Sequence, residues 1–185
     1  MPDRQEIVSS LYGALRLACF DEKGMSHFNI SVEGFWRSFF AAVLLAPFYL
    51  ISIWPEVVTP VGGFSFWSML VHFATYVAGW VLFPLVAFFA TDLLKLGHRF
   101  TALVVVVNWT SLLVFGLFTL CAVIATLFQG SLASLVVTFI TAGLLVYHWF
   151  VIKTALNSSS SIALAFLLFN FVLGGMLYVT GERLL

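Results

Sequence analysis

The sequence has few charged residues. Asp, Glu, Lys and Arg make up 9% of its 185 residues, whereas hydrophobic residues make up 62%. An ordinary water-soluble domain has about 25% charged residues, because these side chains cover its surface. This composition excludes an ordinary soluble protein, and a lipid bilayer is the solvent that fits it.

Several classes of partner and chemistry are excluded in the same way. Cys19 and Cys121 are the only two cysteines, so there is no disulfide framework. With eight Lys and Arg in the whole chain and no basic stripe, we expect no nucleic-acid partner. The sequence has no recognisable metal-ligand spacing, phosphate-binding glycine loop or Ser-His-Asp set. We therefore expect no metal, no cofactor and no enzymatic activity.

Long charge-free stretches are what the sequence has instead, and they predict an all-α polytopic helix bundle. One span needs about 20 apolar residues, because a helix rises 1.5 Å per residue across a core of about 30 Å. The longest stretch lies between Arg99 and Lys153 and holds two spans, with a turn at Gln129-Gly130-Ser131. The five expected spans are 35–54, 64–90, 100–128, 132–152 and 160–180, which form a membrane domain over 35–185.

The segment 1–34 precedes the spans and differs in character, since nine of the sixteen charged residues lie in the first 37 positions. The pattern over about 4–20 predicts an amphipathic helix. We expect this helix either to lie in the membrane interface or to pack across the ends of the spans. Its apolar side is formed by Ile7, Leu11, Leu15 and Ala18, with Gln5, Ser9, Gly13 and Arg16 on the other side.

Three polar residues inside the spans are the candidate site. At 1.5 Å per residue, Asn108, His148 and Asn170 all fall in the cytoplasmic half of the bundle and form one candidate polar layer. Such residues either form a functional polar site or join helices by hydrogen bonds. We favour the hypothesis that these residues join helices by hydrogen bonds, because proton and cation transporters usually carry a membrane-embedded carboxylate and this layer has none.

Small residues at four-residue spacing predict helix-packing faces. Ser134, Thr138 and Ala142 lie on one face of the fourth span, and Gly174 follows Asn170 on the fifth. Small side chains let two helix backbones approach closely in a membrane. We expect these faces to contact other helices, in this chain or in a neighbouring one.

Two segments carry a resemblance to a known family. Gly34-Phe35-Trp36-Arg37 enters the first span, and the stretch 147–156, YHWFVIKTAL, leaves the fourth. With five spans and a cytoplasmic amphipathic segment, the chain resembles the Yip family of small membrane proteins. That resemblance implies the architecture and no enzymatic activity; Yip proteins of eukaryotes are associated with Rab GTPases and vesicle trafficking. The chain is also similar to uncharacterised bacterial inner-membrane proteins, which implies an inner-membrane location and no Rab partner.

Two functions are compatible with these features. The leading hypothesis is a non-enzymatic membrane protein that acts through helix–helix contacts as a scaffold, an assembly factor or a homo-oligomer. Its partners are then the lipid bilayer and either a second copy or another membrane protein. The alternative is a small transporter or channel with its path through the polar layer.

The charges also predict the orientation. If the N-terminus is cytoplasmic, seven of the eight Lys and Arg lie on the inner side and only Arg183 lies outside. A C-terminal alkaline phosphatase fusion should therefore be active and a C-terminal green fluorescent fusion dark. The reverse pattern would overturn the assignment.

Overall fold

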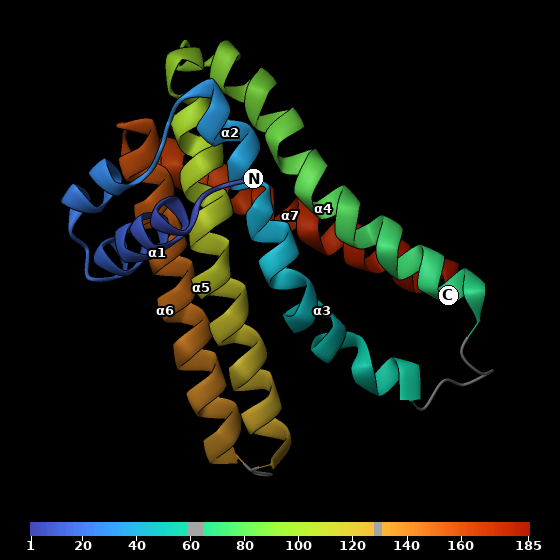
Figure 1. Cartoon of the computed structure of the whole chain (residues 1–185). Coiled ribbons are helices and arrows are strands. Elements are labelled where there is room, and N and C mark those ends of the chain that lie inside the picture. The colour runs from blue at the N-terminus through green and yellow to red at the C-terminus, as the bar shows by residue number, and fades with distance from the viewer. Residues whose placement is uncertain (59–64, 128–130) are drawn as a thin grey trace.

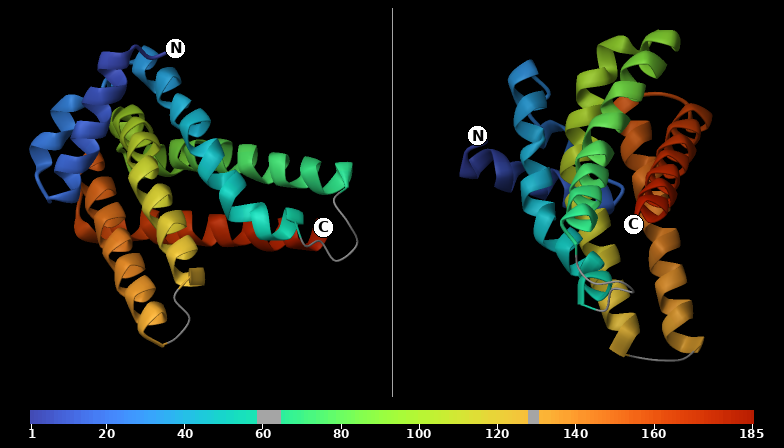
Figure 2. Two further views of the ribbon diagram at one scale, coloured as in Figure 1. Left: turned by 60° about the horizontal axis from the view of Figure 1, so that its bottom comes forward. Right: turned by 90° about the vertical axis from the view of Figure 1, so that its right-hand side faces the viewer.

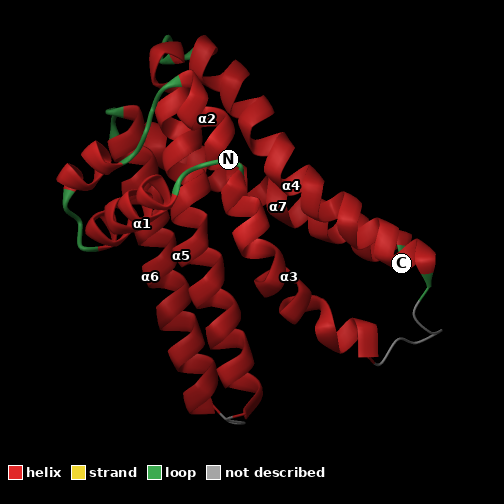
Figure 3. Ribbon diagram, viewed as in Figure 1, coloured by secondary structure: helices red, strands yellow, loops and turns green. Residues whose placement is uncertain are grey.

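The structure is a computed structural model that describes residues 1–58, 65–127 and 131–185. Throughout these residues the regular structure is helical and no strand occurs (Figure 3). This confirms the prediction of an all-α protein. The helices are α1 Arg4–Ala18, η1 Glu22–His27, α2 Val32–Ser38, α3 Phe40–Val58, α4 Phe66–Leu93, η2 Gly97–Arg99, α5 Phe100–Leu127, α6 Ser131–Leu156 and α7 Ser160–Leu184.

Five helical segments in the described residues are long and apolar enough to cross a membrane, which confirms a polytopic bundle. They are Val32–Trp54, Phe66–Leu93, Gly97–Ala125, Ser134–Leu156 and Ser160–Leu184. The first combines α2 and α3, which are separated at Phe39. Phe64, Phe128 and the Gln129-Gly130 part of the predicted turn lie outside the described residues.

The long helices form two pairs that diverge from one end of the molecule (Figures 1 and 2). One arm consists of α5 and α6 side by side, and the other of α4 and α7. The arms are joined near α1, where η2 links α4 to α5 and a short turn links α6 to α7. We call this the α1 end. From there α3 runs along α5, and its far end lies between the arms.

The core lies at the α1 end and is built around the first half of α5. Every residue from Ala102 to Thr110 is buried, and several, including Val104 and Val106, are completely so. This part of α5 is apolar on nearly all sides, which is typical of a helix surrounded by protein. Helices α1, α2, α3, α4 and α6 pack around α5. Far from this core, aromatic side chains such as Phe73, Phe139 and Phe171 are 65–75% exposed and available to lipid.

Helix α1 packs across the ends of α5 and α6, which was one of the two positions expected for it. The Tyr147 hydroxyl donates a hydrogen bond to the Ala14 carbonyl oxygen at 2.9 Å. The predicted apolar and polar sides of α1 do not match the side that packs against the protein. Gly13 was expected on the polar side and is buried, whereas Leu15 was expected on the apolar side and is 53% exposed. Small residues, which permit close approach, therefore select the packing face. That face consists of Ser10, Gly13, Ala14 and Leu17.

Ion pairs hold the α1 region together and attach it to α2. Arg16 pairs with Asp21 just beyond α1, and this guanidinium keeps the pKa of the Asp21 carboxyl below its ordinary value of 3.8. Arg37 of α2 pairs with Glu6 of α1 at 3.0 Å and with Glu33 at 2.5 Å. The pair between Arg37 and Glu6 connects segments 31 residues apart, so it fixes α1 relative to the start of the first span.

The contact between α1 and η1 should tolerate no side chain at Gly13. A Cβ there would lie 2.8 Å from the Gly24 carbonyl oxygen, which belongs to the backbone and cannot move aside cheaply. We expect Gly13→Ala to lower the free energy of unfolding by about 1–3 kcal/mol. Gly79→Ala is the matched control, because a Cβ at Gly79 meets nothing within 4 Å. Thermal unfolding in detergent measures both variants, and equal stability would show that the α1–η1 contact is not as described.

Candidate functional site: an apolar cleft between the two arms

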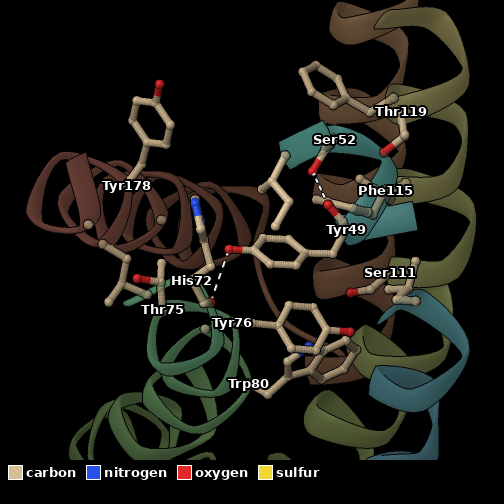
Figure 4. Close-up of a pocket in the computed structure, with 18 of the residues that line it drawn as sticks. Tyr49, Ser52, His72, Thr75, Tyr76, Trp80, Ser111, Phe115, Thr119 and Tyr178 are labelled. Atoms are coloured by element: carbon tan, nitrogen blue, oxygen red, sulfur yellow. Dashed lines mark hydrogen bonds between the residues drawn. The ribbon is translucent and has the colours of Figure 1, made fainter. Parts of the chain in front are cut away.

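A cleft of about 1230 Å³ lies between α3, α4, α5 and α7 (Figure 4). This is somewhat larger than the usual range of small-molecule sites, about 300–1,000 Å³. Most of its lining is apolar. Aromatic side chains are prominent in it, among them Tyr49, Trp54, Tyr76, Trp80, Phe115 and Phe118.

The cleft ends on the core near the α1 end. Val107 and Asn108 mark its deepest part on α5, and both belong to the buried stretch of that helix. On α5 the lining extends outward to Val123, which is about 24 Å along the helix axis. The hydrocarbon core of a bilayer is about 30 Å thick, so the cleft covers most of this depth without crossing it.

The three predicted layer residues all line this cleft, but they form two separate contacts. His148 on α6 and Asn170 on α7 lie together, with Nε2 and Nδ2 3.3 Å apart. Asn108 instead donates a hydrogen bond from Nδ2 to the Ser38 hydroxyl at 2.9 Å. The residues thus share a location near the closed end, and each contact joins two helices.

Ser38 is the partner that sequence reasoning missed. It lies at the end of α2, is completely buried, and donates its own hydrogen to the Phe35 carbonyl oxygen at 2.7 Å. Its position three residues into the predicted first span corresponds to a depth of about 4.5 Å, whereas Asn108, eight residues into the third span, corresponds to about 12 Å. Depth along the predicted spans therefore does not connect these two residues.

Two tyrosines connect α3 to α4 across the cleft, and the sequence analysis did not single them out. The Tyr49 hydroxyl donates to the His72 carbonyl oxygen at 3.1 Å, and the Tyr76 hydroxyl donates to the Ala42 carbonyl oxygen at 2.5 Å. Their ring centroids lie 4.7 Å apart. Each helix thus donates one hydrogen bond to the other, which fixes α3 relative to α4. Figure 4 shows the bond from Tyr49 to His72.

Two lining residues of α5, Ser111 and Thr119, carry hydroxyls that differ in hydrogen bonding. Ser111 donates to the Val107 carbonyl oxygen at 2.7 Å. Thr119 is only 4% exposed, and its Oγ1 has no hydrogen-bond partner within the described part of the chain. An unpaired hydroxyl in a buried position costs free energy. The Thr119 Oγ1 has less than 1 Å² of accessible surface, so a molecule in the cleft does not reach it.

The predicted packing residues lie on two different surfaces. Gly174 lines the cleft, and a Cβ there would meet nothing within 4 Å. Ser134, Thr138 and Ala142 are exposed on α6, where the Thr138 hydroxyl donates to the Ser134 carbonyl oxygen at 2.8 Å. Their role in helix packing remains a prediction about contacts with other chains.

The charge of the cleft is low. Glu182 is the one Asp, Glu, Lys or Arg among the described lining residues. Within the residues that the structure describes, no group of three His, Cys, Asp or Glu is placed to hold a metal ion. These surroundings favour a neutral, largely apolar molecule, because a buried charge without a partner is costly.

Comparison with known proteins assigns no family to the chain. No family model matches it, and neither a curated protein nor a solved structure does. The resemblance to the Yip family is therefore untested, and the function rests on the geometry of the cleft.

A double-mutant cycle tests whether the polar layer consists of two separate contacts. Ser38→Ala and Asn108→Ala should be coupled by about 0.6–1.7 kcal/mol, since each removes the same interhelical hydrogen bond. Asn108→Ala and Asn170→Ala should be additive. Unfolding free energies in detergent provide both values, and strong coupling between the two asparagines would mean that the layer is one network.

Proposed function

We propose that this is a non-enzymatic integral membrane protein that takes up a lipid-like molecule in the cleft between its arms. The observation that supports this proposal best is the shape of the cleft, which is apolar and large and ends on the buried residues Val107 and Asn108. Burial of apolar surface supplies the binding free energy, while a few polar groups orient the guest.

The closed end favours a small amphiphile over a transmembrane helix as the guest. A spanning helix occupies the full thickness of the hydrocarbon core, about 30 Å. Between the arms it would meet the buried stretch of α5 and the contact of Asn108 with Ser38. A molecule that enters from a single leaflet stops short of these residues.

Contact between membrane proteins is the second candidate, and a different surface supports it. The small-residue face of α6 formed by Ser134, Thr138 and Ala142 is exposed, so close approach by another helix is sterically open there. The partner would be a second copy of this chain or another membrane protein. This scaffold function uses the outside of one arm, whereas uptake of a lipid uses the space between the arms.

The orientation and location belong to the same proposal. With the N-terminus in the cytoplasm of a bacterial cell, the α1 end lies at the inner face of the inner membrane, and the cleft opens towards the outer leaflet. The positive-inside distribution of Lys and Arg supports this placement. The Yip-like architecture is compatible with it and remains a proposal.

Tryptophan quenching tests uptake, because Trp54 and Trp80 line the cleft whereas Trp36 and Trp67 do not. Trp54 is itself 63% exposed, so Trp80 is the better reporter of the two. A brominated long-chain hydrocarbon is titrated into nanodiscs that contain the protein. Probe bound in the cleft should quench the cleft tryptophans, and this quenching should saturate at a low mole fraction of probe. Probe in the surrounding lipid should quench the lipid-facing tryptophans in proportion to its mole fraction. The double variant Trp54→Phe/Trp80→Phe should remove the saturable component, and Trp36→Phe/Trp67→Phe should retain it.

Filling the cleft provides the complementary variant. Gly174→Leu places a side chain in the open space and should weaken saturable quenching without lowering thermal stability. Gly143→Leu on α6 is the control, because Gly143 is equally open and is not among the described lining residues. Quenching without any saturable component in the unaltered protein would refute uptake. Loss of stability in Gly174→Leu alone would instead show that Gly174 packs against a helix.

A further inference from the structure

We propose that the guest of the cleft is a neutral lipid alcohol and that the side-chain amide oxygen of Asn170 accepts a hydrogen bond from its hydroxyl. This inference rests on the proposed uptake of a lipid-like molecule and specifies the group by which that molecule is recognised. A hydroxyl is uncharged and can donate, and the surroundings of Asn170 require both properties. A hydrocarbon, or a molecule whose oxygen can only accept, leaves the amide oxygen without a partner.

The contact with His148 determines which atom of Asn170 is available to a guest. Asn170 Nδ2 and His148 Nε2 lie 3.3 Å apart, and within the described residues this is the one hydrogen-bond contact of the Asn170 side chain. An amide nitrogen can only donate, so His148 Nε2 is the acceptor of this bond. The amide oxygen, Oδ1, is then the atom of Asn170 that is left for a guest, and it can only accept.

The Asn170 amide oxygen is also accessible. In the described part of the chain, the side-chain oxygens that are both covered by protein and unpaired belong to Ser10, Thr119, Thr154 and Ser158. Asn170 is not one of these residues and is only partly buried, so its unpaired Oδ1 keeps accessible surface. Because Asn170 lines the cleft, a molecule in the cleft can reach this oxygen.

The space beside Asn170 is open and long. Gly174 lies one turn further along the same face of α7 and also lines the cleft, and a Cβ there would meet nothing within 4 Å. From Asn170 the lining on α7 continues to Leu185, about 22 Å along the helix axis. A guest bound by its hydroxyl at Asn170 therefore has room for a long alkyl chain that points towards the far end of the arms.

The depth of Asn170 restricts the charge of the guest. Asn170 lies ten residues from the start of α7 at Ser160 and fourteen from its end at Leu184, or about 15 Å and about 21 Å of helix. Half of the hydrocarbon core is about 15 Å thick, so the amide lies well inside the apolar layer. Glu182, the one charged residue in the described lining, is about 18 Å further along α7. A charged headgroup is costly at this depth, whereas a hydroxyl that finds an acceptor is not.

Competition between three matched probes tests the inference. A long-chain alkanol, its methyl ether and the alkane of equal length are each used to displace the brominated hydrocarbon from the cleft in nanodiscs. Each affinity is measured in the unaltered protein and in Asn170→Leu, so that the preference of a probe for the bilayer itself cancels. We expect the alkanol to bind about 2- to 10-fold more weakly to the variant, the ratio that one net hydrogen bond provides. The ether and the alkane should show no such loss, because neither can donate.

Tyr147→Phe is the matched control for a general loss of stability. Asn170→Leu removes the contact between α6 and α7, and Tyr147→Phe likewise removes one hydrogen bond between helices, which the Tyr147 hydroxyl donates to the Ala14 carbonyl oxygen. Tyr147 is not among the described lining residues of the cleft. We therefore expect Tyr147→Phe to keep the alkanol affinity of the unaltered protein, even where its thermal stability falls.

NMR of the unaltered protein with ¹⁵N-labelled asparagine gives a second readout. The chain has four asparagines, Asn29, Asn108, Asn157 and Asn170. The pair of side-chain amide signals that is missing from the spectrum of Asn170→Leu belongs to Asn170. This pair should shift more on saturation with the alkanol than with the alkane, because a hydrogen bond to Oδ1 polarises the amide.

The possible failures are distinguishable. Absence of saturable binding for every probe would overturn the proposed uptake itself. Saturable binding without loss of alkanol affinity in Asn170→Leu would leave uptake standing and overturn the role of Asn170, as would an equal loss in Tyr147→Phe. An equal loss for the alkanol and the ether would overturn the assignment of the guest as a hydrogen-bond donor.

Discussion

Close packing around the first half of α5 is the constraint on which the rest of the structure depends. The stretch from Ala102 to Thr110 is buried, and five other helices pack around α5. Each loses lipid contact there and gains dense van der Waals contact, the main source of helix association in a membrane. Because the α4–α7 arm meets α5 and α6 near the α1 end, it is free to diverge from them further along. The cleft is thus a consequence of where the close packing stops.

Van der Waals packing around α5 does not by itself determine how the helices are positioned relative to one another, and hydrogen bonds between them do. The contact of Asn108 with Ser38 joins α5 to α2, and His148 with Asn170 joins α6 to α7. Tyr49 and Tyr76 connect α3 to α4 further out. In hydrocarbon each such bond contributes about 0.6–2 kcal/mol, which is small beside helix insertion but sufficient to select one arrangement among several. Polar residues inside the spans therefore outline the cleft.

The sequence predicts the all-helical class and the number of long apolar helices. Each span must be long enough to cross the hydrocarbon core and must lack charged residues, and both conditions can be checked for one segment at a time. The sequence also places Asn108, His148 and Asn170 in the same half of the bundle, and the structure shows all three in the lining of one cleft. It does not predict which of them meet, since Asn108 pairs with Ser38 according to how α2 is rotated. Nor does it predict the packing face of α1, where Gly13 is buried because of its close approach to Gly24. The cleft itself depends on the angle between the two helix pairs, and no residue pattern within a single helix encodes that angle.

A structure of the protein in a lipid nanodisc by cryo-electron microscopy tests the central claim most directly. We expect two helix pairs that diverge from the α1 end, with elongated density between them that passes Trp80. Closed arms, with α7 packed against α5 and no density between them, would contradict the proposed uptake.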